Sequence, residues 1–156
     1  MNTIRHQIAI AAPLSKVYKM LSTPKAIGKW WDEQTVVESN EGIVMEHDPG
    51  AEHGKVRLKV VQQKADVLVE WKCISDHPDS SPASAWTGTH FLFEVSEDDS
   101  PASIIERSCS GNSDASLTTL NFSQTGYDPA SKFYGFNNHA WGQVLENLKS
   151  VCETEK

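Results

Sequence analysis

The feature that most constrains the fold is a long apolar stripe near the C-terminus, between Phe133 and Val151. Asp128 and Pro129 precede it, and helices often start with an aspartate as N-cap and a proline at the first position. The spacing predicts a helix of about six turns with one broad apolar face. Such a helix needs a large apolar surface to pack against. Its expected face comprises Phe133, Phe136, Asn137, Ala140, Trp141, Val144, Leu145, Leu148 and Val151.

The middle of the chain has the alternating pattern that is typical of β-strands. Turn residues such as Asp48-Pro49-Gly50 separate its segments, and short links between strands favour an antiparallel meander. Residues 96–114 are polar and serine-rich, so we expect a long hairpin excursion there, with a short strand at Ile104–Arg107. The other expected strands are residues 3–10, Thr35–Glu38, Ile43–His47, Lys55–Val61, Val67–Ile74, Trp86–Val95 and Ser116–Gln124.

Two prolines mark a pair of short helices after the first strand. Pro13 suits a first helical turn, because its missing N–H would be unpaired there anyway. Thr23-Pro24 ends this first helix and starts a second, with Thr23 as N-cap and Pro24 at the first position. The expected buried sides are Leu14, Val17, Tyr18 and Leu21 in the first helix, and Ala26, Ile27 and Trp30 in the second.

Together these elements predict an α+β fold of the helix-grip type. In it, a curved antiparallel sheet of six to seven strands wraps around the long C-terminal helix, and two short helices follow the first strand. The chain has 156 residues, which is enough for one domain and short for two. We therefore expect a single domain over residues 1–156.

The chain also resembles a known family. The pattern I-x-A-P-x-x-x-V-Y-x-x-L-S-T-P-x-A-I-x-x-W-W, from Ile10 to Trp31, is similar to the first strand and helix pair of the START-like (SRPBCC) superfamily. Within it, the chain most resembles the polyketide-cyclase-like branch named after the activator of the heat-shock-protein-90 ATPase. The segments VEWKC (69–73), WTGTHFLFEV (86–95), LNFSQTGY (120–127) and WGQVLENLK (141–149) agree in the expected order. The resemblance implies a cavity between sheet and long helix that holds apolar or amphipathic small molecules.

Charge and cysteine usage exclude several classes of protein. The net charge is −7, which argues against a nucleic-acid partner or an anionic membrane surface. No apolar run approaches the ~20 residues of a membrane span, and the N-terminus lacks the apolar core of a signal peptide. The three cysteines are far apart and form no C-x-x-C pair, so we expect a cytoplasmic protein.

No catalytic or metal-binding motif is present in the sequence. The patterns H-E-x-x-H, G-x-S-x-G and G-x-x-x-x-G-K-[ST] are all missing. His47 and His53 flank a turn, but no third metal ligand is evident, and His53 and His77 are expected as exposed loop histidines. We therefore expect neither a metal nor another cofactor.

The candidate binding residues are aromatic side chains on the elements that would surround the cavity. Asn137 joins them, because an amide on the apolar face of the long helix needs a partner from the sheet or from a ligand. His90 and Glu94 sit in a strand; the outer face is the favoured interpretation, and an inward position would make them polar groups of the cavity. The expected ligand-binding set is Trp31, Trp71, Trp86, Phe91, Phe93, Phe133, Asn137 and Trp141.

Three functions are compatible with this pattern. The favoured hypothesis is a protein that binds an apolar or amphipathic small molecule without converting it, with the helix pair that ends at Trp30-Trp31 as a lid. The first alternative is a cyclase- or hydrolase-like enzyme that uses an inward histidine or carboxylate. The second is a regulator of a chaperone ATPase, which rests on the resemblance alone. A dry, aromatic cavity would favour binding, and His90 or Glu94 beside Asn137 would favour catalysis.

Overall fold

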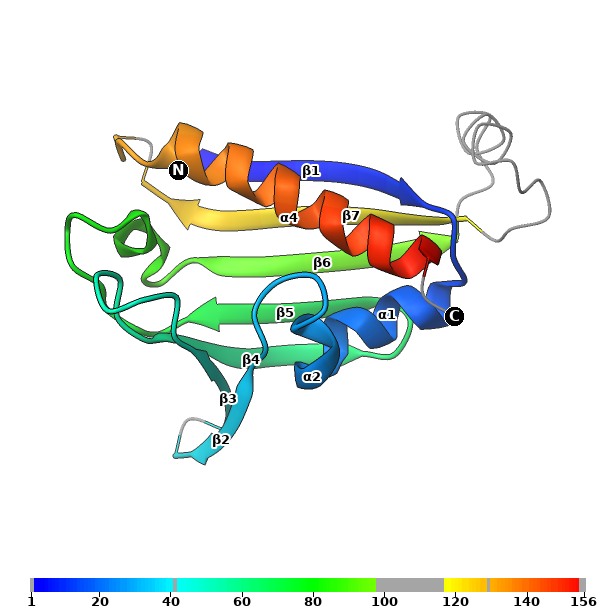
Figure 1. The fold of residues 1–156 in the computed structure, drawn as a ribbon, viewed down its shortest axis with the longest axis horizontal. Coiled ribbons are helices and arrows are strands. Elements are labelled where there is room, and N and C mark those ends of the chain that lie inside the picture. The colour runs from blue at the N-terminus through cyan, green and yellow to red at the C-terminus, as the bar shows by residue number, and fades with distance from the viewer. Residues whose placement is uncertain (1, 41, 98–116, 129, 155–156) are drawn as a thin grey trace.

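A computed structural model describes residues 2–40, 42–97, 117–128 and 130–154 of the chain. Its centre is a seven-stranded antiparallel sheet with the order β1-β7-β6-β5-β4-β3-β2 (Figure 1). Apart from β1, which pairs with β7, the strands follow the chain as a meander, as expected from the short links. The strands are β1 (Asn2–Ile10), β2 (Thr35–Ser39), β3 (Gly42–His47), β4 (Val56–Lys64), β5 (Leu68–Cys73), β6 (His90–Glu97) and β7 (Thr118–Tyr127).

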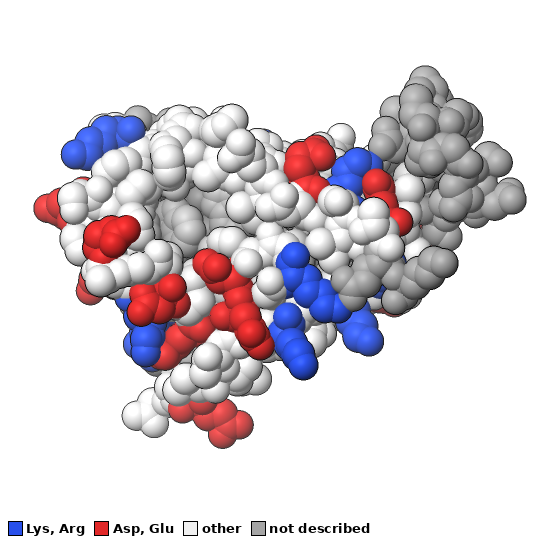
Figure 2. Space-filling view, in the orientation of Figure 1, with Lys and Arg blue, Asp and Glu red and all other residues white. Residues whose placement is uncertain are grey.

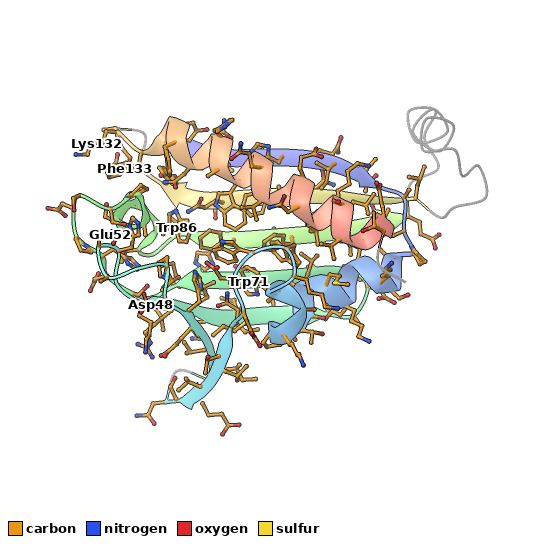
Figure 3. The ribbon with its side chains drawn as sticks, in the orientation of Figure 1. Asp48, Glu52, Trp71, Trp86, Lys132 and Phe133 are labelled. Carbon is orange, nitrogen blue, oxygen red and sulfur yellow. The ribbon has the colours of Figure 1, made fainter. Side chains whose placement is uncertain are left out.

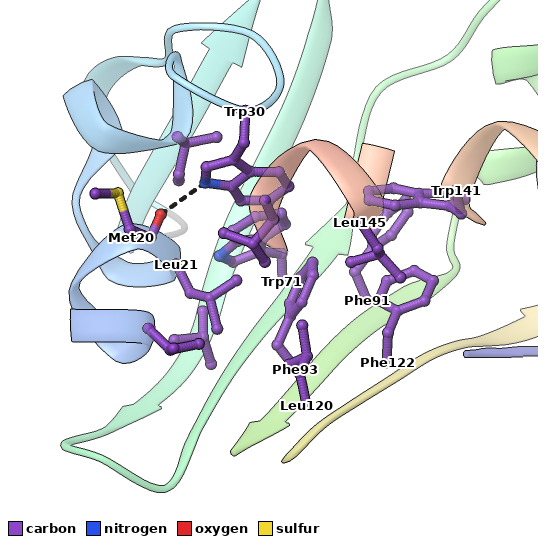
Figure 4. Packing of buried hydrophobic residues seen from close by; sticks show 14 of the residues in the cluster. Met20, Leu21, Trp30, Trp71, Phe91, Phe93, Leu120, Phe122, Trp141 and Leu145 are labelled. Carbon is purple, nitrogen blue, oxygen red and sulfur yellow. Dashed lines mark hydrogen bonds between the residues drawn. The ribbon is translucent and has the colours of Figure 1, made fainter. Parts of the chain in front are cut away.

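The predicted helix pair after the first strand is present as α1 (Leu14–Ser22) and α2 (Pro24–Ile27). Thr23 separates the two helices, although its side chain makes no capping hydrogen bond. Trp30 fixes the pair, because its indole N–H donates to the carbonyl of Met20 over 2.9 Å. Figure 4 shows this bond beside the aromatic core. The indole therefore ties the segment after α2 to the last turns of α1.

The long helix, α4 (Tyr134–Thr154), lies across the same face of the sheet as α1 (Figure 1). It begins later than the predicted start at Pro129. The Asp128 carboxylate accepts from the backbone N–H of Ala130 over 2.9 Å, and the Ser131 hydroxyl accepts from that of Phe133 over 3.2 Å. Such side-chain bonds stabilise turns in competition with a helix. The buried side of α4 consists of Asn137, Trp141, Leu145, Leu148 and Cys152.

The core between α4 and the sheet is filled with large side chains. Figure 4 shows Trp71, Phe91, Phe93 and Phe122 of the sheet packed against α4. The rings of Trp141 and Phe122 are stacked with centroids 4.5 Å apart. The resemblance implied a cavity between these two layers, but these rings occupy the middle of that space.

One expected strand is shorter than predicted. Residues 86–95 were expected to be extended, whereas Pro82–Trp86 form the 3₁₀ helix η1 and β6 starts only at His90. Ser81 caps η1 by accepting from the N–H of Ala83 over 3.1 Å. Gly88 then takes a φ of 81°, a conformation that interrupts an extended strand.

Two expectations lie wholly or partly outside the described residues. The expected strand Ile104–Arg107 falls within residues 98–116, as does most of the excursion 96–114. For the same reason, the single domain over residues 1–156 stays a prediction. The described ranges contain no helix that is long and apolar enough to cross a membrane.

Candidate functional site

A pocket of about 210 Å³ lies at one end of the space between the sheet and α4. The first half of α4 and η1 form one side, and the loop between β3 and β4 and the segment after α2 form the other. Most of its lining is apolar, which is how small-molecule sites are usually built. The lining residues are Trp31, Asp32, His47, Pro49, His53, Val56, Pro82, Ala83, Trp86, Phe136, Asn137, Ala140, Trp141 and Val144.

Three indole rings from different elements form the aromatic part of this lining. The ring centroid of Trp31 lies 5.2 Å from that of Trp141 and 6.0 Å from that of Trp86. Trp86 and Trp141 are themselves 6.2 Å apart. The rings therefore pack on one another and present a continuous apolar wall, and Figure 3 shows Trp86 near the end of the sheet.

Other predicted binding residues support this wall from below. Trp71, Phe91 and Phe93 are fully buried and do not line the pocket. The ring of Trp71 stacks under Trp31 with centroids 6.2 Å apart, and Phe91 lies 5.4 Å from Trp86. Their effect on a ligand would therefore be indirect, through the positions of the Trp31 and Trp86 rings.

Asn137 is buried, and its amide is already hydrogen-bonded within the protein. Its Nδ2 donates to the carbonyl of Pro82 over 3.2 Å and to the hydroxyl of Tyr127. The amide thus joins α4 to η1 and to the end of β7. Burial raises the pKa of Tyr127, so its hydroxyl stays protonated at neutral pH.

Three predicted residues lie away from the pocket. Phe133 comes just before α4 and does not line the pocket, and the Lys132 ammonium lies 5.1 Å from its ring centroid. Figure 3 labels the two residues near each other at one end of the molecule. His90 and Glu94 alternate with the buried Phe91 and Phe93 and so point to the opposite face of the sheet. There the Nδ1 of His90 lies 2.7 Å from a Glu70 carboxylate oxygen. The structure therefore places neither of them beside Asn137.

The pocket instead contains polar residues that sequence reasoning did not assign to it. His47, at the end of β3, has a side chain that is only 4% exposed, and its Nδ1 lies 2.9 Å from Oε1 of Gln34. Its Nε2 lies 3.7 Å from a carboxylate oxygen of Asp32, which is 51% exposed. The rings of His47 and Trp31 make an edge-to-face contact, with centroids 4.7 Å apart. Burial lowers the pKa of His47, and the nearby Asp32 offsets part of this effect.

A second polar group holds the loops that border the pocket. His53 and His77 are half-buried rather than exposed, because both are tied into a hydrogen-bonded chain. The Nδ1 of His77 donates to the carbonyl of His53 over 2.7 Å, and its Nε2 lies 2.8 Å from the Ser75 hydroxyl. The Nδ1 of His53 lies 2.6 Å from the Ser81 hydroxyl. Ser75 and His77 do not line the pocket, so this serine–histidine pair supports the loops.

Carboxylates lie along one side of the pocket. Figure 2 shows them over the loop between β3 and β4 and over the segment after α2, whereas Lys and Arg side chains gather over α1 and α2. Figure 3 places Asp48 and Glu52 on that loop. Within the described ranges, no three His, Cys, Asp or Glu side chains come together in a way that could hold a metal ion.

The sequence matches no protein-family model, and no curated protein is similar to it. Solved structures are similar in fold. The Aha1 dimer from Colwellia psychrerythraea is 22% identical with a TM-score of 0.73, and the match covers 100% of this chain and 99% of that one. CalU16 from Micromonospora echinospora is 12% identical with a TM-score of 0.62 and coverages of 98% and 77%.

DynU16, from the dynemicin biosynthetic locus, is 14% identical with a TM-score of 0.65. The match covers 100% of this chain and 49% of DynU16. Together with Aha1 and CalU16, it confirms the predicted fold. The chain therefore has the same α+β helix-grip fold as these three solved structures.

Proposed function

We propose that this protein binds an apolar or amphipathic small molecule in the pocket lined by Trp31, Trp86 and Trp141. The observation that supports the proposal most is the combination of an aromatic wall with few polar groups in one concave site. The volume of about 210 Å³ is below the roughly 300–1,000 Å³ of sites for drug-sized ligands, so the ligand is compact. We also propose that this binding takes place in the cytoplasm.

Two measurements test this function. Native mass spectrometry of the protein purified from its own host should show a retained small molecule. Naphthalene should change the intrinsic tryptophan fluorescence, and Trp31→Ala should weaken its binding several-fold because the ring forms part of the wall.

Phe133→Ala is the matched control, because Phe133 is an aromatic residue of the same region outside the pocket. It should leave naphthalene binding unchanged. Binding that is equally strong in the wild type and in Trp31→Ala would contradict a site at this pocket.

A cyclase- or hydrolase-like enzyme is the second candidate, and His47 is the observation that favours it. A buried imidazole in a pocket has the position of a general base. Wild type and His47→Phe can be incubated with a host metabolite extract and compared by mass spectrometry. A species that is consumed only by the wild type, with a matching product, would establish turnover.

A chaperone partner is the third candidate. It is favoured by the likeness to Aha1 and by the exposed apolar side chains of Val36 on β2 and Ile43 on β3. Figure 1 shows that this hairpin extends away from the rest of the sheet. A pull-down with the host heat-shock-protein-90 chaperone tests this candidate, and Val36→Ser should reduce capture if the hairpin is the contact.

A further inference from the structure

The protonation of His47 follows from its hydrogen-bond partners. Nε2 of Gln34 donates to the backbone carbonyl of Asp32 over 2.6 Å, and a carbonyl oxygen can only accept. This bond fixes the orientation of the Gln34 amide, so Oε1 is the atom that faces His47. Because Oε1 is also only an acceptor, the proton of a neutral His47 must be on Nδ1. Nε2 then carries a lone pair.

This lone pair faces another acceptor. The Asp32 carboxylate oxygen is 3.7 Å from Nε2, which is too long for a hydrogen bond. Within the described part of the chain, no protein group donates a hydrogen bond to Nε2. Burial and the nearby His77 lower the pKa of His47, and Asp32 and Asp48 raise it; burial is the largest effect, so the imidazole is neutral near pH 7. Asp32 and His53 are the other titratable residues that line this pocket. Two acceptors thus face each other with no hydrogen between them.

The surroundings restrict what can fill this gap. The rings of Trp31 and His47 lie edge to face with centroids 4.7 Å apart, and both residues line the pocket, so a ligand group that reaches Nε2 also contacts the indole wall. A carboxylate there would face Asp32, with Asp48 and Glu52 on the neighbouring loop (Figure 3). Binding of such an anion is unfavourable, because its carboxylate would lose water on burial and would be repelled by the nearby protein carboxylates. The three indoles pack too closely on one another to surround an ammonium group.

We propose that the pocket selects neutral aromatic ligands that carry a hydroxyl group, a phenol or an enol, whose O–H donates to Nε2 of His47. The ring of the ligand packs on the indole wall, and Asp32 excludes ligands that carry a carboxylate. This inference rests on the proposed binding function and assigns specificity to His47 and Asp32. In it, Gln34 is a positioning residue that holds the tautomer of His47.

Three probes of matched shape test the proposal by calorimetry: 2-naphthol, 2-methoxynaphthalene and 2-naphthoate. The wild type should bind 2-naphthol roughly three- to tenfold more tightly than 2-methoxynaphthalene, which is the usual net value of one hydrogen bond. Binding of 2-naphthoate should be the weakest. His47→Phe keeps the ring and loses the acceptor, so the preference for 2-naphthol should disappear. Asp32→Asn should strengthen 2-naphthoate binding.

His90→Phe is the control, since His90 lies on the opposite face of the sheet and should leave all three affinities unchanged. A pH series provides a readout that needs no variant. Below the lowered pKa of His47, Nε2 carries a proton and can donate to the oxygen of either probe, so the preference for 2-naphthol over 2-methoxynaphthalene should disappear.

The outcomes separate this inference from the function on which it rests. Equal binding of 2-naphthol and 2-methoxynaphthalene by the wild type would overturn the hydroxyl selectivity and leave the binding function standing. Tightest binding of 2-naphthoate, or of 2-naphthylamine added as a fourth probe, would overturn the ligand class. If none of the probes binds, both the inference and the proposed function are wrong.

Discussion

At the scale of single residues, two buried polar side chains determine the character of the pocket. Asn137 is 2% exposed, and its amide is used within the protein, where it joins α4 to η1 and β7. His47 is also buried, but only its Nδ1 has a partner at hydrogen-bond distance among the described residues. The difference assigns a structural role to the first residue and leaves the second with an unused acceptor.

The lowered pKa of His47 predicts how stability depends on pH. In the unfolded chain this histidine titrates near its ordinary value of about 6.5, and in the folded chain it titrates lower. As the pH falls below about 6.5, the unfolded state binds the proton before the folded state does. The free energy of unfolding should therefore fall as the pH falls from about 6.5 toward the folded pKa. Urea unfolding of wild type and His47→Phe between pH 7.5 and 5 measures the difference. A fall of equal size in both proteins would rule out His47 as its source.

Replacement of Asn137 by Leu tests the structural role of the amide. The change leaves the Pro82 carbonyl and the Tyr127 hydroxyl without their donor, so the free energy of unfolding should fall by about 1–3 kcal/mol. It should also alter which ligands bind, because a polar group is lost from the wall. Asn147→Leu, at an exposed position of the same helix, should cost much less. Equal costs for the two variants would show that the hydrogen bonds of Asn137 contribute little.

At the scale of elements, the helix pair positions one wall of the pocket. The bond from Trp30 to Met20 ties the segment after α2 to α1, and this places the next residue, Trp31, over Trp71 and beside Trp141. Of the predicted lid Trp30-Trp31, only the Trp31 indole lines the pocket, because Trp30 is buried in the core. The break between the two helices at Thr23 directs this segment toward α4.

The proline in that break should be dispensable for the fold. Pro24 occupies the first position of α2, where its ring only pre-organises the backbone. Pro24→Ala should therefore unfold cooperatively and cost about 1 kcal/mol or less. Chemical denaturation followed by circular dichroism measures both quantities. A broad, non-cooperative transition would mean that the break needs the proline.

At the scale of the whole molecule, Trp141 connects the layers that form the pocket. Its ring lies 4.5 Å from Phe122 on β7, 5.4 Å from Phe91 on β6 and 5.2 Å from Trp31. It therefore contributes both to the core and to the pocket lining. The sheet, the long helix and the segment after α2 meet at this single side chain.

Trp141→Ala should destabilise the protein by about 3–5 kcal/mol, because a large cavity would open between the layers. Phe136, five residues earlier on α4, is 60% exposed, so Phe136→Ala should change the free energy of unfolding by less than about 0.5 kcal/mol. Guanidinium denaturation of the two variants makes the comparison. Similar values would show that the helix is not held to the sheet through Trp141.

The sequence by itself determined most of the elements and their order, although not the 3₁₀ helix η1. Periodicity located the long helix and most strands, because a side chain's face depends only on local spacing, and Thr23-Pro24 marked the helix break through local backbone chemistry. The late start of α4 at Tyr134 was missed, because it depends on the side-chain bonds of Asp128 and Ser131 to the backbone. Short, competing interactions of this kind leave no periodic signal.

Only the tertiary structure decided which residues form the pocket. Trp31, Trp86, Asn137 and Trp141 were identified from the sequence, whereas Asp32 and His47 were not, because their meeting depends on how the loop after α2 folds back against the end of β3. Aromatic residues are easy to place near a core by their size and hydrophobicity. The position of a polar group relative to a pocket depends on strand register and loop path, and those are fixed by packing between segments far apart in the chain.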